Sequence, residues 1–273
     1  MTCEVKVIAA SRRRGGTRVL WSIQLRYWRA IHGELMTHRD FSRNAGSSRA
    51  TPVKKMLAQV WNDPAGPIHW GANQAGMQAR AQLVGWRYAA AGALWRTAGK
   101  VMCGFAWGLM KLGLHKQVAN RLLEPWQYIN VLVSSTEWKN FFALRDHVDA
   151  QPEMQELAEA ILLAQWCFDP QELDAGEWHM PYVSAVERQQ LDLFTCIRLS
   201  AARCARISIE PFDGDASIVK EIGRHDLLVG SEPIHASPTE HQAKVLDDED
   251  RRVKNFVGFD QYRGYVEIGL EPV

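Results

Sequence analysis

The sequence predicts a mixed α/β protein rich in helices, and three observations lead to that prediction. The 273 residues are 47% hydrophobic and 23% charged, a globular composition that can bury a core. Two N-terminal segments show strand patterns, and most of the chain after residue 77 shows helical spacing of apolar residues. We expect a single domain over residues 1-273, with strands and an arginine-rich loop at 1-60, a helical part at 77-204 and a C-terminal segment at 205-273.

The first elements are two strands, at residues 3-9 and 17-28, joined by a turn at 13-16. The second strand shows the period-2 alternation of a half-buried strand. Its alternating apolar side chains are Val19, Trp21, Ile23, Leu25 and Tyr27. Beyond it, the spacing of Ile31 and Leu35 indicates a short helix.

Residues 40-50 are predicted to form a loop. Thr51 and Pro52 after it are typical of an N-cap and a first helical residue. A second loop at 61-76 precedes a long helix that we expect to begin at Met77. The remaining predicted elements are helices at 115-123, 135-145, 152-167 and 185-202 and a last strand at 265-270.

Two of these helices have a capping-box spacing at their start, Ser134 with Glu137 and Ser184 with Glu187. The long helix contains glycines that recur every seven residues, which favours close helix packing within the chain or between subunits over a ligand role. These glycines are Gly85, Gly92 and Gly99.

Several classes of protein are disfavoured. The longest uncharged stretch near the middle, 101-110, is about half a membrane span, and the N-terminus lacks the features of a signal peptide, so we expect a cytoplasmic protein. The five cysteines form no C-x-x-C pair and are predicted to be buried thiols. The common phosphate-loop, dinucleotide and hydrolase motifs are missing. His235 and His241 are six residues apart, a poor metal pair, and we expect no metal.

The charge distribution is uneven although the net charge is only +1. Residues 1-55 contain twelve Lys or Arg and three acids, whereas residues 210-273 contain seven basic and fourteen acidic residues. A sequence pI near 7.7 disfavours a wide surface for nucleic acid, which needs many phosphate contacts. Small phosphorylated ligands fit this distribution better, and we expect neither a stable nucleic-acid complex nor a membrane partner.

The segment 37-49 concentrates groups that bind phosphate. It contains one histidine, three arginines, three serines and an asparagine, followed by a predicted helix N-terminus. Guanidinium groups, hydroxyl donors and the helix dipole all favour phosphate oxygens. Taken alone, an arginine-rich segment of this kind is more often a solvated loop of surface salt bridges, and that alternative is favoured here without further observations.

Within this segment, His38-Arg39 with Ser47 and Arg49 resembles the signature of the flavin-dependent thymidylate synthases, R-H-R followed by seven residues and a serine. Thr37 replaces the leading arginine of that signature. The resemblance implies that Ser47 and Arg49 contact the nucleotide. It also implies a flavin-binding group, His38, Arg39, Ser42 and Asn44.

A second region supports the resemblance. Residues 140-145, with 150-153 after them, are similar to the family's N-F-L-x-L-R and A-Q-x-E segments, which implies flavin contact by Asn140 and pyrimidine contact by Arg145. Residues 118-125 are similar to the family's A-R-x-x-L-P segment, which makes Arg121 a phosphate ligand beside Arg49. Polar positions on an amphipathic helix and a solvated cation remain the simpler alternatives.

A third likeness lies out of order. Ala201 to Cys204 and Ser237 to His241 resemble segments that precede the R-H-R motif in the family, so the chain resembles a circularly permuted variant. The likeness implies flavin contact by His241. Ser237, Pro238 and Glu240 also have the pattern of a helix cap and first turn, and this alternative stays open.

The resemblance implies a small, twisted, mainly antiparallel sheet surrounded by helices, and a homotetramer. It also implies an FAD-dependent methyltransferase that moves a one-carbon unit from methylenetetrahydrofolate to C5 of dUMP, with NADPH as reductant. Ser47 and Arg145 would be catalytic, and no cysteine nucleophile would be needed. Glu34, where the family has glutamine, joins the nucleotide group and leaves open dCMP as substrate or a hydroxymethyl product. A noncatalytic nucleotide- or RNA-binding protein that stacks bases on tryptophans is the alternative of another class.

Overall fold

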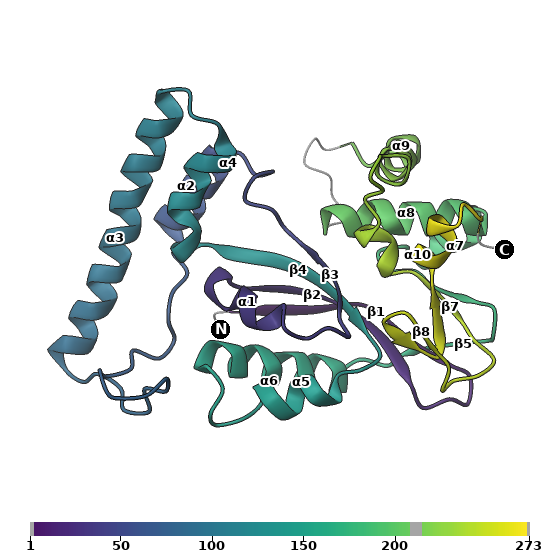
Figure 1. The fold of residues 1–273 in the computed structure, drawn as a ribbon, viewed down its shortest axis with the longest axis horizontal. Coiled ribbons are helices and arrows are strands. Elements are labelled where there is room, and N and C mark those ends of the chain that lie inside the picture. The colour runs from purple at the N-terminus through teal and green to yellow at the C-terminus, as the bar shows by residue number, and fades with distance from the viewer. Residues whose placement is uncertain (1–2, 208–214, 272–273) are drawn as a thin grey trace.

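A five-stranded sheet forms the centre of the protein, in a computed structural model that describes residues 3-207 and 215-271 (Figure 1). Its strand order is β3-β4-β2-β1-β5, and only the short β1-β5 pair is parallel. The strands are β1 (Glu4–Arg13), β2 (Val19–Trp28), β3 (Ser42–Ala45), β4 (Tyr128–Ser135) and β5 (Gln171–Leu173). This arrangement confirms the predicted mixed α/β fold with a mainly antiparallel sheet.

Helices surround this sheet (Figure 1). Those before the C-terminal region are α1 (His32–Leu35), α2 (Val53–Asn62), α3 (Trp86–Lys111), α4 (Lys116–Ala119), α5 (Lys139–Arg145) and α6 (Pro152–Trp166), with 3-10 helices η1 (Arg29–Ile31) and η2 (Asn120–Trp126). The long helix α3 packs on α2 and η2 beside the sheet, and α5 and α6 lie along one face of it.

The C-terminal region adds helices and two small sheets. The helices are α7 (Ala185–Gln190), α8 (Leu193–Arg206), α9 (Ile218–Val229) and α10 (Tyr262–Glu267), with η3 (Ser237–Glu240). The strands are β6 (Trp178–His179), β7 (Ala243–Val245), β8 (Arg252–Val253), β9 (Phe256–Val257) and β10 (Phe259–Gln261). Strands β10, β7 and β6 pair in one sheet, and β8 pairs with β9 in the other.

The two faces of the central sheet differ in polarity because side chains alternate along each strand. Ile23 and Leu25 of β2 and Val131 and Val133 of β4 are fully buried in the main core, which α5 and α6 cover. The opposite face carries polar side chains under the C-terminal elements. Serines from three neighbouring strands lie directly opposite one another there, Ser42, Ser134 and Ser22.

Strand β4 was not predicted, and its presence corrects two expectations. From Val131 to Val133 the strand is apolar at three successive positions, because both faces of β4 are covered there and these residues are fully buried. Ser134 therefore belongs to a strand and caps no helix, and the helix predicted at 135-145 begins only at Lys139. The part predicted as helical, 77-204, thus contains the strands β4, β5 and β6.

Other boundaries also differ from the predictions. The loop predicted at 40-50 contains β3, because residues 42-45 pair with the unpredicted β4. Helix α2 begins at Val53 with Pro52 as its N-cap residue, and α3 begins at Trp86 rather than at Met77. The helix predicted at 185-202 is divided into α7 and α8. Residues 262-267 form helix α10, so the predicted strand at 265-270 is wrong.

Several local predictions are confirmed. Strands β1 and β2, helix α6 and the capping box between Ser184 and Glu187 occur where the patterns indicate them. Gly99 lies against the indole of Trp126 and so serves packing within the chain, whereas Gly85 precedes α3 and Gly92 faces only Arg96 of the same helix. Four cysteines are buried as predicted, but Cys167 is exposed at the end of α6. Within the described residues, no helix combines the length and apolarity of a membrane span.

Candidate functional site

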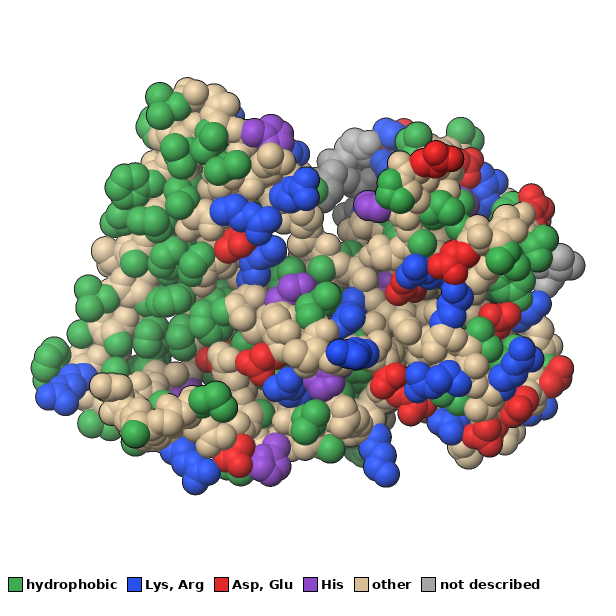
Figure 2. Space-filling view, in the orientation of Figure 1, with side chains coloured by type: hydrophobic (Ala, Val, Ile, Leu, Met, Phe, Trp, Pro, Cys, Tyr) green, Lys and Arg blue, Asp and Glu red, His purple; other side chains and the backbone are tan. Residues whose placement is uncertain are grey.

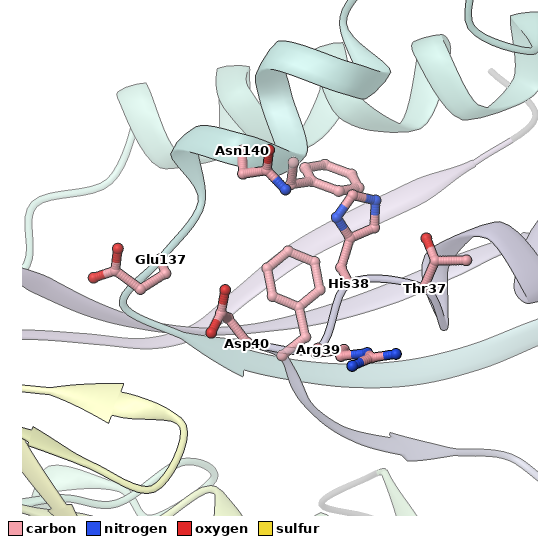
Figure 3. A pocket seen from close by; sticks show the side chains of 8 residues that line it. Thr37, His38, Arg39, Asp40, Glu137 and Asn140 are labelled. Atoms are coloured by element: carbon pink, nitrogen blue, oxygen red, sulfur yellow. The ribbon is translucent and has the colours of Figure 1, made fainter.

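Two segments far apart in the sequence form a pocket of about 240 Å³ beside helix α5 (Figure 3). The first segment follows α1, and the second runs from the connection after β4 into the first turn of α5. The lining residues are Thr37, His38, Arg39, Asp40, Phe41, Glu137, Asn140 and Phe141. Three residues that the family resemblance assigns to flavin, His38, Arg39 and Asn140, therefore meet at one cavity.

Side-chain hydrogen bonds hold these two segments in place. The Arg43 guanidinium donates to the carbonyl oxygens of Met36 at 2.8 Å and His38 at 3.0 Å, which fixes the turn that follows α1. The Ser135 hydroxyl donates to the carbonyl oxygen of Asp40 at 3.1 Å and accepts from the backbone N–H of Glu137 at 2.9 Å. Ser135 thereby connects the two halves of the pocket.

Arg145, at the end of α5, binds three residues of the first segment. Its Nε donates to His38 Nε2 at 3.1 Å, and its Nη1 donates to Glu34 Oε2 at 2.8 Å. Its Nη2 lies 3.3 Å from Thr37 Oγ1. The structure thus brings together four positions singled out in the sequence, among them both departures from the family pattern, Glu34 and Thr37.

The imidazole of His38 is held in a largely apolar environment. Its ring lies edge-on to Phe141 at 5.0 Å and beside Phe41 at 5.6 Å between ring centroids. Burial, and then the positive charges of Arg145 and Arg43, lower the pKa of His38 below its ordinary value. His38 is therefore a neutral hydrogen-bonding group near pH 7.

Charged groups surround the pocket opening. Asp40 pairs with Arg252 of β8 at 2.9 Å, and Glu137 pairs with Arg18 at 3.1 Å. Arg39 is exposed. Since both carboxylates already have cationic partners, they do not oppose the approach of an anionic ligand as strongly as free acids would.

The turn after β3 meets helix η2 and forms a second polar group. The amide of Asn120 donates to the carbonyl oxygens of Ser48 at 2.7 Å and Thr51 at 2.9 Å. Glu124 accepts from the Ser48 hydroxyl at 2.9 Å and from Arg121 Nη1 at 2.8 Å. These bonds place Arg121 on the segment that packs against the turn.

The turn after β3 and the residues around it are rich in cations, and together they form a cationic turn. Arg49 is exposed on the turn, and Lys116 Nζ donates to the carbonyl oxygen of Ala50 at 2.9 Å. Arg29 also lies 3.4 Å from Glu124. Lys and Arg side chains gather beside α2 and α4, next to a hollow between these helices and the C-terminal region (Figure 2). Such a concentration of donors suits a phosphate dianion.

The four residues of β3 separate the pocket from this cationic turn. At about 3.3 Å per residue, the separation along the strand is roughly 13 Å. A ligand group at the pocket and a phosphate at the turn can therefore occupy neighbouring positions along one strand.

Three other flavin candidates lie elsewhere, on the polar face of the sheet. Ser42 accepts from the amide of Gln261 at 2.9 Å, and Asn44 donates to the carbonyl oxygen of Cys204 at 3.0 Å. His241 is fully buried, with its Nδ1 2.8 Å from Ser134 Oγ. All three contact the protein itself, and none lines the pocket.

Some residues of the site lie outside the motif positions named from the sequence. Asp40, Phe41 and Glu137 line the pocket, and Asn120 and Glu124 organise the cationic turn. Asp40 and Phe41 are part of the motif segment, and Glu137 is three residues before Asn140, so closeness to motif residues was a usable signal for these three. Nothing in the sequence alone indicates that the Glu124 carboxylate accepts hydrogen bonds from both Ser48 and Arg121.

Comparisons with known proteins return structures but no sequence relatives. No family model matches the sequence, and no curated protein matches it. The UMP/dUMP methylase PolB from Streptomyces cacaoi, solved with 5-Br UMP, is similar over 60% of this chain and 88% of its own, with 15% identity and a TM-score of 0.48. The flavin-dependent thymidylate synthase ThyX from Helicobacter pylori, complexed with FAD and dUMP, is similar over 54% of this chain and 67% of its own, with 20% identity and a TM-score of 0.37. The family that the motifs resemble is thus represented among these structures.

Proposed function

We propose that this protein is a flavin-dependent methyltransferase that transfers a one-carbon unit from methylenetetrahydrofolate to C5 of dUMP. One observation carries the proposal: His38 and Asn140, which come from motifs about one hundred residues apart, line one pocket, and Arg145 of the second motif donates to His38. The family resemblance assigns these residues to the flavin and the pyrimidine. A chance likeness of short motifs gives no reason for them to converge.

The residues at the pocket fit a flavin ring. Phe41 and Phe141 supply apolar walls, and His38 and Asn140 supply hydrogen-bonding groups beside them. Arg39 supplies an exposed cation for a phosphate of the cofactor. When bound, FAD reduced by NADPH would supply the hydride for reductive methylation.

Ser42, Asn44 and His241 form the second part of the predicted flavin group. Their side chains bind neighbouring protein groups. We propose that they act on the cofactor through the position of β3 and β4, since Ser42 and Asn44 are on the strand between the pocket and the cationic turn.

The nucleotide would extend from the pocket to the cationic turn. Arg49 and Arg121 would bind its phosphate, and Ser47 would orient the reacting ring or assist proton movement. Arg145, with Glu34 beside it, would face the pyrimidine and stabilise negative charge that develops on the ring. Each role follows the family motif at the matching position.

The cysteines support a mechanism without a thiolate nucleophile. Burial raises the pKa of Cys3 to about 11 and also raises the pKa values of Cys103, Cys196 and Cys204. None of the five cysteines lines the pocket. A thiol kept protonated by burial is a weak nucleophile, so the chemistry is left to the cofactor and to positioning.

The pair Glu34-Arg145 supports dCMP as a second candidate substrate. Glu34 Oε2 is an acceptor only, and Arg145 is a donor only. Cytosine and uracil present opposite donors and acceptors at their N3 edge, so one polar group can change the preference. A hydroxymethyl product from the same site is the other form of this candidate.

We also propose a homotetramer. Helix α3 and the residue that follows it expose large apolar side chains, each at least half accessible to solvent. They are Leu94, Val101, Phe105 and, after the helix, Leu112. Large exposed apolar surfaces on a soluble protein commonly bind other subunits. Light scattering on the purified protein gives the number of subunits directly.

The decisive experiment for the function begins with the purified protein and added FAD. A yellow protein with a flavin absorbance band supports the enzyme, whereas a colourless protein that cannot bind FAD supports the noncatalytic nucleotide- or RNA-binding alternative. The flavin-loaded protein is then incubated with methylenetetrahydrofolate, NADPH and either dUMP or dCMP. Mass spectrometry of the nucleotides distinguishes methyl from hydroxymethyl products, and no product from either substrate would refute the proposed reaction.

A further inference from the structure

The contact between Arg145 and His38 determines where the proton of the imidazole lies. Arg145 Nε donates to His38 Nε2 at 3.1 Å, and a guanidinium has no acceptor atom. His38 Nε2 must therefore carry a lone pair. A neutral imidazole with a lone pair on Nε2 carries its proton on Nδ1.

We propose that Arg145, in addition to the charge that it would present to the pyrimidine, is a positioning residue for His38: it fixes His38 as the Nδ1–H tautomer, so that His38 presents one N–H donor to the pocket. The proposal rests on the proposed function for the identity of the ligand, a flavin ring. The tautomer itself is a property of the ligand-free protein.

Arg145 can do this because its own guanidinium is held on both sides. Nη1 donates to Glu34 Oε2 at 2.8 Å. Nη2 lies 3.3 Å from Thr37 Oγ1, whose hydroxyl donates to the Glu34 carbonyl oxygen at 2.7 Å. Every nitrogen of the fork therefore has a partner, and the Nε–H direction is set by contacts on the far side of the guanidinium.

The same contacts give a physical reason for the two departures from the family signature. An arginine at position 37 would place a second cation next to Arg145, which like-charge repulsion disfavours. Thr37 supplies a neutral hydroxyl there, and Glu34 supplies the carboxylate that pairs with Arg145. The two changes are thus complementary, and together they build the support for one guanidinium.

The electrostatic surroundings keep His38 neutral. The charged groups that act on it are Arg145, Arg43 and Asp40. Burial is the largest effect on its pKa, and the two arginines lower the pKa further, whereas Asp40 acts in the opposite sense. An imidazolium would also place an N–H against the Arg145 donor, so the contact itself disfavours protonation.

The pocket defines what the Nδ1–H can bind. Figure 3 shows Asn140 on the side of His38 that faces away from Thr37, where the Nδ1 edge lies. A fixed donor beside an amide that both donates and accepts suits the edge of a flat heterocycle with alternating carbonyl and N–H groups. The dioxopyrimidine edge of a flavin has that pattern.

The test is nitrogen NMR of the ligand-free protein labelled with ¹⁵N at its nine histidines. The signal that disappears in His38→Ala identifies His38, and its nitrogen shifts report which ring atom carries the proton. We expect the Nδ1–H form in the wild type at pH 7. We expect a mixture of tautomers in Arg145→Ala, and an unchanged signal in Lys139→Ala, which alters an exposed cation on the same helix.

An Nε2–H or doubly protonated His38 in the wild type would overturn the proposal, and so would a folded Arg145→Ala protein whose tautomer is unchanged. If Arg145→Ala does not fold, the wild-type spectrum alone decides. FAD titration of the same proteins should show roughly tenfold weaker binding in Arg145→Ala, the effect of about one hydrogen bond. A protein with the expected tautomer that binds no FAD refutes the proposed function and leaves the positioning role intact.

Discussion

Acidification should loosen the C-terminal elements from the central sheet, because two buried histidines join them through neutral imidazoles. His179 Nδ1 lies 2.8 Å from Ser11 Oγ, and its Nε2 lies 2.8 Å from Ser22 Oγ. Ser22 Oγ is 2.5 Å from Ser134 Oγ, which is 2.8 Å from His241 Nδ1. The five side chains form one hydrogen-bonded row, and protonation of either imidazole requires a buried charge in it.

The size of the effect follows from the pKa values. Burial lowers the pKa of both His179 and His241 from 6.5 to about 3. Because the folded pKa lies below the unfolded one, this stability is fully present above pH 6.5 and is lost as the pH falls toward 3. Each histidine removes at most about 1.4 kcal/mol per pH unit, and because an unfolded histidine is only half protonated at pH 6.5, the pair removes roughly 3 kcal/mol between pH 6.5 and 5. This loss is a large part of the free energy of unfolding of a folded domain, which is typically about 5–15 kcal/mol.

Urea unfolding at pH 7, 6 and 5 measures this dependence while most carboxylates remain ionised. His241→Gln should reduce the slope of unfolding free energy against pH by about one proton. His235→Gln, at an exposed histidine nearby, should leave the slope unchanged. A stability that stays constant from pH 7 to 5, or an unchanged slope in His241→Gln, would show that the buried imidazoles are not what titrates.

Three further predictions concern single side chains. Arg49→Ala should weaken dUMP binding by about tenfold or more and leave FAD affinity unchanged, because it removes one charged partner of the phosphate. Calorimetry with each ligand measures both affinities, and an equal loss of dUMP and FAD affinity would contradict the division of roles. Ser47→Ala should slow turnover by about 10²-fold with FAD still bound, and unchanged turnover would reduce Ser47 to a turn residue. Ser237→Ala should leave the thermal midpoint unchanged, since the η3 helix has no side-chain cap bond; a loss of about 1 kcal/mol would restore the cap interpretation.

Strongly periodic or capped elements could be predicted from the sequence, and a fully buried strand could not. The alternation around Ile23 identifies β2 because one face of that strand is apolar and the other polar. In β4 the three successive apolar residues Val131 to Val133 break such an alternation, and Ser134 with Glu137 has the spacing of a helix cap. Periodicity cannot separate a short buried strand from a buried helix, so β4 was missed and β3 with it.

The pocket depends on that missed strand. Ser42 pairs with Ser134 in the β3-β4 register, and this pairing brings the segment around His38 beside the segment around Asn140. The motif resemblance could say that both segments contact flavin, but not how the backbone brings them together. The contacts of Arg145 with Glu34 and Thr37 were equally hidden, because no spacing rule connects residues more than one hundred positions apart.

The two C-terminal segments that resemble family motifs lie near β3 and β4 in space, although they are far from these strands in the sequence. The segment ending at Cys204 offers its carbonyl oxygen to Asn44 of β3, and His241 contacts Ser134 of β4. Both displaced segments therefore lie against the two strands that carry or adjoin the R-H-R-like motif. What a fold requires is that these groups meet, since hydrogen bonds and burial depend on positions in space and not on the order of segments along the chain. Segments that lie far apart along the chain can therefore make such contacts in any order, and the buried Ser-His row holds β6 and the segment of His241 against the central sheet.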